Sequence, residues 1–161
     1  MASMAARTAA RGWLGAPSLW GLIERRAAAT PDAVLARDDA GRELTFAGYR
    51  DAGLRAAAGL AADYGITTGT SVSWELPTWN ESLVLVGALA RLGARQNPII
   101  PIYRSREVGF ITRQSQAALL VVPPTYRDFD FAAMARGVAA ERPGLQVLVV
   151  DRSSCAPNSA L

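Results

Sequence analysis

The sequence contains no lysine and no histidine, and its only cysteine is Cys155, close to the C-terminus. All 17 basic residues are therefore arginines. These absences exclude a Ser-His-Asp or Cys-His nucleophile system, a Schiff-base lysine, a zinc site of His and Cys ligands, and an intrachain disulfide. The chain is thus poorly equipped to carry out covalent or metal-dependent catalysis by itself.

Long apolar runs and basic clusters are also missing. No stretch reaches the roughly 18 apolar residues that a bilayer span needs, so we expect no membrane span. The net charge is +3, but the arginines are scattered and Arg25-Arg26 is their only adjacent pair, so we expect no nucleic-acid binding. With 161 residues, 50% of them hydrophobic, the chain has room for one domain or part of a larger one.

The two ends differ in composition from the rest. Residues 1–17 contain alanines, Arg7 and Arg11 but no acidic residue, a composition that resembles an organellar transit peptide only weakly. We favour a flexible N-terminal extension instead, and we expect a cytoplasmic protein. Residues 152–161 are mostly small or polar and cannot repay the entropy lost on ordering. We predict a disordered tail there, with Cys155 exposed.

Between these ends, apolar patterns of helix and strand type alternate. Helices are predicted at 19–29, 46–64, 80–92, 105–115 with Ser105 as the N-terminal cap, and from 131 to the Pro143-Gly144 stop. Strands are predicted at 33–37 and 43–46, which form a hairpin, and at 71–76, 94–100, 119–122 and 146–150. Short apolar strands that alternate with helices indicate an α/β fold, in which an N-terminal hairpin and helix precede a mainly parallel sheet.

Several polar motifs have structural interpretations. The segment 65–71 superficially resembles a phosphate-binding loop, but it lacks the lysine and precedes a strand, so we interpret it as a turn. Asp38 and Asp39 are interpreted as solvated turn residues. Asp128 and Asp130 are interpreted as a loop residue and a helix cap, because no third oxygen ligand for a metal is near them in sequence.

Two tryptophans are the weak candidates for a binding site. Trp74 and Trp79 flank Leu76-Pro77 at the carboxyl end of a predicted strand, where open α/β sheets bind ligands. They could line a substrate cleft, although we favour packing in the core or at its rim.

Two longer stretches resemble the core motifs of a known superfamily. The first runs from Leu44-Thr45-Phe46-Ala47-Gly48-Tyr49 through 56–60 to Tyr64-Gly65-Ile66, and the second comprises Leu76-Pro77, 88–94 and 97–103. Both resemble the adenylate-forming superfamily of acyl-CoA synthetases, peptide-synthetase adenylation domains and luciferases. The likeness extends over about 19–151. Within it, 73–79 and 96–104 are similar to the cyclohexanecarboxylate and medium-chain acyl-CoA ligases.

This resemblance implies a function in acyl activation, as in fatty acid metabolism. Members activate a carboxylic acid with ATP to an acyl adenylate, then transfer the acyl group to coenzyme A, usually with magnesium. It implies that 18–151 form a partial N-terminal subdomain, incomplete relative to the full family domain. The family's phosphate loop, ribose-binding acid, magnesium-site glutamate and catalytic lysine lie beyond this length, so we assign no catalytic, cofactor-binding or metal-binding residue.

Two hypotheses follow from these observations. In the first, the chain is an N-terminal fragment of an ATP-dependent carboxylate–CoA ligase, inactive alone, whose partner is the remainder of the ligase or a second polypeptide. The alternative is a non-catalytic binding module or truncated relic that docks onto a partner. Because a partial sheet leaves an edge strand and apolar faces uncovered, we also expect self-association.

Overall fold

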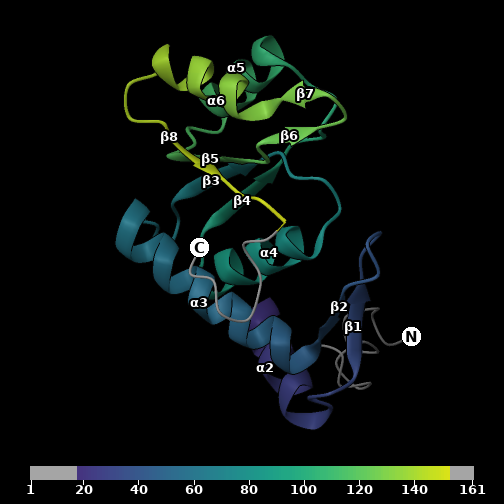
Figure 1. Ribbon diagram of the computed structural model, residues 1–161. Helices are drawn as coiled ribbons and strands as arrows, with labels where there is room; N and C mark the ends of the chain where they lie inside the picture. The colour runs from purple at the N-terminus through teal and green to yellow at the C-terminus, as the bar shows by residue number, and fades with distance from the viewer. Residues whose placement is uncertain (1–17, 153–161) are drawn as a thin grey trace, which may run out of the picture.

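The centre of the fold is a four-stranded parallel sheet. A computed structural model describes residues 18–152 (Figure 1). Along the sheet the strands follow the order β4 (Arg95–Pro98), β3 (Ser71–Trp74), β5 (Leu119–Val122) and β8 (Gln146–Val149). All neighbouring strands are parallel. The predicted α/β fold with a mainly parallel sheet is therefore confirmed.

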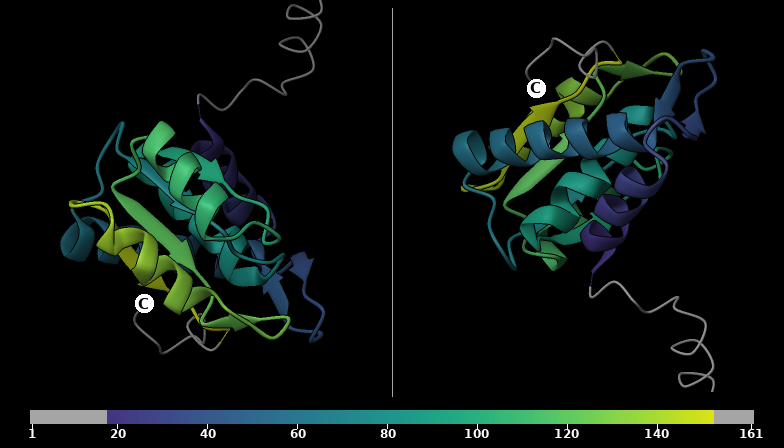
Figure 2. Two further views of the ribbon diagram at one scale, coloured as in Figure 1. Left: turned by 90° about the horizontal axis from the view of Figure 1, so that it is seen from above. Right: turned by 90° about the horizontal axis from the view of Figure 1, so that it is seen from below.

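Helices cover both faces of this sheet, as the views from above and below show (Figure 2). All four residues of β5 are buried, which is typical of a strand with helices on both sides. Because successive side chains of a strand point to opposite faces, Leu119 and Val121 join one hydrophobic cluster while Leu120 and Val122 join the other. The protein thus has two cores, separated by the sheet.

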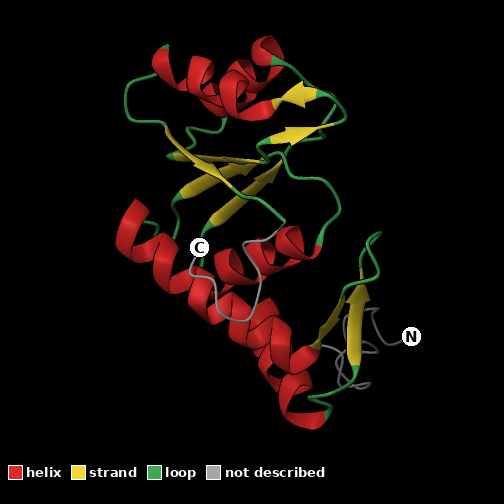
Figure 3. Ribbon diagram, in the orientation of Figure 1, coloured by secondary structure: helices red, strands yellow, loops and turns green. Residues whose placement is uncertain are grey.

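Three helices form the layer on one face: α2 (Leu19–Ala29), α3 (Phe46–Tyr64) and α4 (Asn80–Leu92), coloured red in Figure 3. Their predicted bounds are confirmed. Glycines allow the close approach of these helices, because a Cβ atom on Gly87 of α4 would lie 2.9 Å from Oη of Tyr49 on α3. A Cβ atom on Gly53 would lie 3.1 Å from the Trp20 ring.

The ends of these helices follow from local chemistry. Oγ1 of Thr45 accepts a hydrogen bond from the Gly48 N–H at 3.0 Å, which satisfies a free donor in the first turn of α3. Gly65 and Gly93 follow α3 and α4 with φ angles of 65° and 68°, in the left-handed region that favours glycine. The antiparallel hairpin of β1 (Val34–Arg37) and β2 (Glu43–Thr45) precedes α3 as predicted.

Helices α5 (Ser105–Gln114) and α6 (Phe131–Ala140) cover the other face. Asp130 caps α6 as predicted, since its Oδ1 accepts the Ala133 N–H at 2.8 Å. The prediction that Ser105 caps α5 is wrong, because Ser105 is the first helical residue and Arg104 occupies the cap position. There the Glu107 carboxylate accepts the Arg104 N–H at 3.3 Å, which satisfies a free donor at the start of the helix.

A second hairpin was not predicted. Strands β6 (Thr125–Tyr126) and β7 (Phe129–Asp130) pair antiparallel after β5. Their two-residue turn holds Arg127 and Asp128 at φ angles of 48° and 60°. Such turns usually carry Asn-Gly or Asp-Gly, so the sequence offered no recognisable signal.

The segment 65–71 is a turn before β3, as predicted. The Gly69 N–H donates to the Gly93 carbonyl at 2.9 Å, and Thr68 Oγ1 donates to the Leu92 carbonyl at 3.0 Å, so the turn is attached to the end of α4. Between residues 18 and 152, no helix is both long and apolar enough to cross a bilayer. The expected N-terminal extension, most of the expected tail, and Cys155 lie outside the described residues.

Candidate functional site

The carboxyl edge of the sheet is the place where this fold can form a ligand site. From β3 the chain passes through α4 to β4 on one side, whereas from β5 it passes through α6 to β8 on the other side. The two connections cover opposite faces (Figure 1). The strand order therefore reverses between β3 and β5, and open α/β sheets bind ligands beyond the carboxyl ends of strands at such a point. The residues that follow β3 and β5 define the candidate site.

Glu75, directly after β3, is a buried acid at this point. Its exposed fraction is 0%, and its N–H donates to the Val121 carbonyl at 2.8 Å. Neither carboxyl oxygen has a hydrogen-bond partner among the residues 18–152. Burial disfavours the charged form and raises the pKa of Glu75 to about 8, while the positive charge of Arg104 opposes that rise in part. At neutral pH the carboxyl group is therefore mainly protonated.

An aromatic cluster closes the same edge. Trp79 meets Tyr126 of the β6–β7 hairpin edge-to-face, with ring centroids 6.0 Å apart. Phe131, at the start of α6, lies 6.5 Å from Tyr126 and 5.0 Å from Phe129. The Arg104 guanidinium lies 4.0 Å from the centre of the Phe129 ring, a distance at which a cation is attracted to the ring face. The unpredicted hairpin thus supplies two of the rings at this edge.

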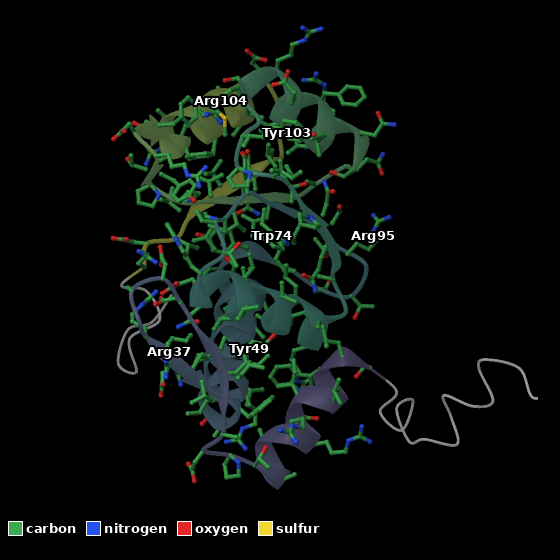
Figure 4. All side chains as sticks on the ribbon, turned by 90° about the vertical axis from the view of Figure 1, so that its right-hand side faces the viewer. Arg37, Tyr49, Trp74, Arg95, Tyr103 and Arg104 are labelled. Carbon is green, nitrogen blue, oxygen red and sulfur yellow. The ribbon has the colours of Figure 1, made fainter. Side chains whose placement is uncertain are left out.

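The structure places the two candidate tryptophans in different surroundings. Trp74 is half-buried against the core cluster of α3 and α4, and its Nε1 has no partner among the described atoms. Figure 4 shows Trp74 near the level of the sheet, between Tyr49 on one side and Tyr103 and Arg104 on the other. Trp79 is 7% exposed and belongs to the aromatic cluster. A substrate-binding role for either residue stays a prediction.

A charged cluster fixes the β1–β2 hairpin to the start of α4. The Arg42 guanidinium donates to both carboxylate oxygens of Glu81, at 2.8 and 3.0 Å, and to Oδ2 of Asp38 at 2.7 Å. Asn80 donates to the Arg42 carbonyl at 3.1 Å. These bonds, first of all the one to Glu81, raise the pKa of Arg42 above its ordinary value. We call Asp38, Arg42, Asn80 and Glu81 the Arg42 cluster.

The Arg42 cluster corrects one prediction and adds one contact. The Asp38 side chain is only 1% exposed, so its interpretation as a solvated turn residue is wrong, whereas Asp39 is 73% exposed. Burial alone would raise the pKa of Asp38, but hydrogen bonds from the Arg42 backbone and side chain outweigh it and lower that pKa. The Arg42 side chain also donates to the Arg152 carbonyl at 2.6 Å. Arg152, placed in the expected tail, therefore contacts the hairpin.

These surroundings do not form a metal site. Among residues 18–152, no three His, Cys, Asp or Glu side chains are grouped closely enough to hold a metal ion. The buried acids Asp38 and Glu81 are both paired with Arg42, and Glu75 stands apart from them. The residues present therefore do not fit the magnesium that the family implies, and none of them is assigned to it.

Comparison with known proteins identifies the family. Residues 23–161 match the AMP-binding enzyme family. The chain belongs to this family. Over 154 residues it is 32% identical to a salicyl-AMP ligase / salicyl-S-ArCP synthetase of Mycobacterium tuberculosis, an alignment that covers 93% of this chain and 27% of the relative. It is also 27% identical over 150 residues to the medium-chain fatty-acid–CoA ligase of Escherichia coli, covering 92% and 26% respectively.

A solved structure agrees with this assignment. A putative long-chain-fatty-acid CoA ligase from Rhodopseudomonas palustris superimposes with a TM-score of 0.73 at 25% identity. The superposition covers 89% of this chain and 37% of that structure. This chain spans about a quarter of the length of the two curated relatives, as the resemblance to a partial family domain predicted.

Proposed function

We propose that this chain is the N-terminal portion of an adenylate-forming ligase that activates a carboxylic acid with ATP and transfers the acyl group to coenzyme A. The observation that carries the proposal is the family match over 23–161, together with a parallel sheet whose strand order reverses at β3. The relatives are a salicyl-AMP ligase and a medium-chain fatty-acid–CoA ligase, which supports an aromatic or medium-chain acid as substrate. We place the protein in the cytoplasm.

We further propose that acyl activation requires residues beyond this chain. The sequence has no lysine, whereas the resemblance implies a phosphate-loop lysine and a catalytic lysine in the full family domain. Charge that develops on a transferring phosphate needs cations placed in advance, and arginines engaged in structural contacts do not replace them. The first partner we expect is therefore the polypeptide that supplies the rest of the ligase.

The test is an assay of pyrophosphate release. Purified chain receives ATP, magnesium, coenzyme A and either salicylate or decanoate, and we expect release no faster than in the absence of enzyme. If the reading frame downstream of this one encodes a phosphate loop with a lysine, the protein that it encodes is purified and added to the assay. Pyrophosphate release should then appear. Turnover by the lone chain would overturn the claim of inactivity. Failure of the two pieces to bind or turn over would overturn the proposed assembly.

A second candidate is a non-catalytic binding module that docks onto another protein. The observation that favours it is that residues 18–152 contain two hydrophobic clusters, one on each face of the sheet. A downstream region without any phosphate-loop sequence would favour this module over a divided ligase. Its partner would then be identified by cross-linking to the purified chain.

A further inference from the structure

The segment that follows β4 carries an unusual amount of exposed apolar surface. The three most exposed large hydrophobic residues of the described chain are Ile102 at 62%, Phe110 at 59% and Ile100 at 57%. All three lie between the end of β4 and the middle of α5. Exposed apolar side chains that gather in one place mark ligand or partner sites more often than scattered ones do.

A hollow lies on the same part of the surface. Its volume is about 590 Å³, within the range of small-molecule sites. The lining consists of three apolar or aromatic residues and three charged ones: Tyr103, Phe110, Ile111, Arg106, Glu107 and Arg113. All of them belong to α5 or to the residue pair that leads into it, so one short segment builds the hollow.

The helical repeat brings the two arginines to opposite sides of Phe110. Arg106, Phe110 and Arg113 follow each other at spacings of four and three, which places them on one face of α5. Val108 and Thr112, on the opposite face, are fully buried against the sheet. The Arg113 guanidinium lies against Gly109, because a Cβ atom on Gly109 would be 3.4 Å from Nη1 of Arg113, in van der Waals contact.

The charge of this face is positive and unpaired. Within residues 18–152, neither Arg106 nor Arg113 forms an ion pair with a carboxylate. The one acid in the hollow, Glu107, accepts the Arg104 N–H at the start of α5 and is held toward that end. Two exposed guanidinium groups on either side of an exposed aromatic ring suit a ligand that has both an apolar body and a negative head.

We propose that this hollow binds an anionic amphiphile, whose apolar chain or ring packs on Tyr103, Phe110 and Ile111 and whose carboxylate or phosphate pairs with Arg106 and Arg113. The same chemistry can come from a free acid or from an anionic lipid in a bilayer. The proposal depends on α5 and the two residues that lead into it, and it is independent of the proposed ligase function.

The experiment uses the full chain at a concentration where light scattering shows no change of mass. Decanoate, below its micelle concentration, is titrated by calorimetry, with decanol as the uncharged ligand of equal length. We expect decanoate to bind at least about tenfold more tightly than decanol, since only the carboxylate can accept charge-assisted hydrogen bonds from the two arginines. Sedimentation with phosphatidylglycerol and phosphatidylcholine vesicles tests the bilayer source.

Surface variants assign the binding to the hollow. The double variant Arg106→Gln/Arg113→Gln should weaken decanoate binding at least about tenfold, whereas Arg91→Gln/Arg136→Gln, which removes the same charge from exposed positions on α4 and α6, should not. Phe110→Ser should also weaken it, and Leu54→Ser, an exposed position on α3, should not. Circular dichroism verifies the fold of each variant.

The binding measurements either support or overturn the proposed site. Decanoate binding that the double variant and Phe110→Ser both lose supports the proposal with a free acid as the source. Binding only to phosphatidylglycerol vesicles, lost in the same variants, supports it with a lipid as the source. Equal affinity for decanol, undiminished binding by the variants, or no binding to either decanoate or acidic vesicles would overturn it.

Discussion

Glu75 illustrates how one buried residue links the stability of the fold to pH. Its ordinary pKa is 4.5 and its pKa in the fold is about 8, so the folded state holds a proton that the unfolded state releases between these values. The contribution of this group to stability is therefore fully present below about pH 4.5, declines as the pH rises toward about 8, and does not change further above that.

We predict that Glu75→Gln stabilises the protein at pH 8 and changes little at pH 4.5, because the amide cannot ionise. The free energy of unfolding should rise by on the order of 3 kcal/mol at pH 8. Thermal melts between pH 4.5 and 8.5 measure it, with the exposed Glu141→Gln as the control for loss of one carboxyl group. A melting temperature of Glu75→Gln that follows the wild-type pH profile would contradict the buried, protonated state.

Gly87 tests the close approach of α3 and α4. A Cβ atom at this position would lie 2.9 Å from Tyr49 Oη, so the buried Tyr49 ring or one of the two helices must shift. We predict that Gly87→Ala lowers the free energy of unfolding by about 2 kcal/mol, even though alanine favours helices. Gly59→Ala on α3, where no other atom of the described residues would contact the new Cβ within 4 Å, should instead stabilise by about 0.5–1 kcal/mol. Urea denaturation distinguishes the two, and equal effects would argue against the close packing.

At the scale of elements, the Arg42 cluster joins a hairpin to a helix that is 38 residues further along the chain, as the separation of Arg42 and Asn80 shows. Removal of the arginine would leave two nearly buried carboxylates, Asp38 and Glu81, without their counter-charge. An uncompensated buried charge costs much more than the loss of a surface ion pair.

We therefore predict that Arg42→Met lowers the free energy of unfolding by about 3 kcal/mol, measured by urea denaturation at pH 7. The matched control is Arg37→Met in the same hairpin. Arg37 pairs with Glu43, and their side chains are 65% and 43% exposed, so this substitution should change the free energy of unfolding by less than about 0.5 kcal/mol. If both variants lose the same stability, the cluster does not attach the hairpin to α4.

At the scale of the whole molecule, the sheet has two open edges within the described chain. β4 and β8 each pair with one neighbour, and Val147, Leu148 and Val149 of β8 are only half-buried. The outer N–H and C=O groups of such strands are available to another chain, as are the exposed side chains beside α5.

We predict that the isolated chain self-associates, so that its mass in multi-angle light scattering rises with concentration. Ile102→Ser should reduce the effect, because it removes the most exposed large hydrophobic side chain of the described residues, and Arg136→Gln should not. A constant monomer mass at high concentration would show that the open edges are protected.

The predicted helices and strands largely match the structure because each depends on local chemistry. Thr45, Asp130, Gly65 and Gly93 occupy cap or stop positions that short-range hydrogen bonds and backbone sterics require. The hairpin of β6 and β7 escaped prediction because Arg127 and Asp128 adopt positive φ angles without the usual glycine. The helix α5 begins with an arginine in the cap position, against the ordinary preference.

By itself, the sequence determined the alternation of helices and strands, the family, and the absence of lysine and histidine chemistry, because periodicity, motif order and composition are properties of the linear chain. Only the tertiary structure decided that Asp38 is enclosed, that Arg42 meets Glu81, and that the buried Glu75 carboxyl has no hydrogen-bond partner within residues 18–152. Desolvation and ion pairing depend on which distant segments surround a group. No local pattern contains that information.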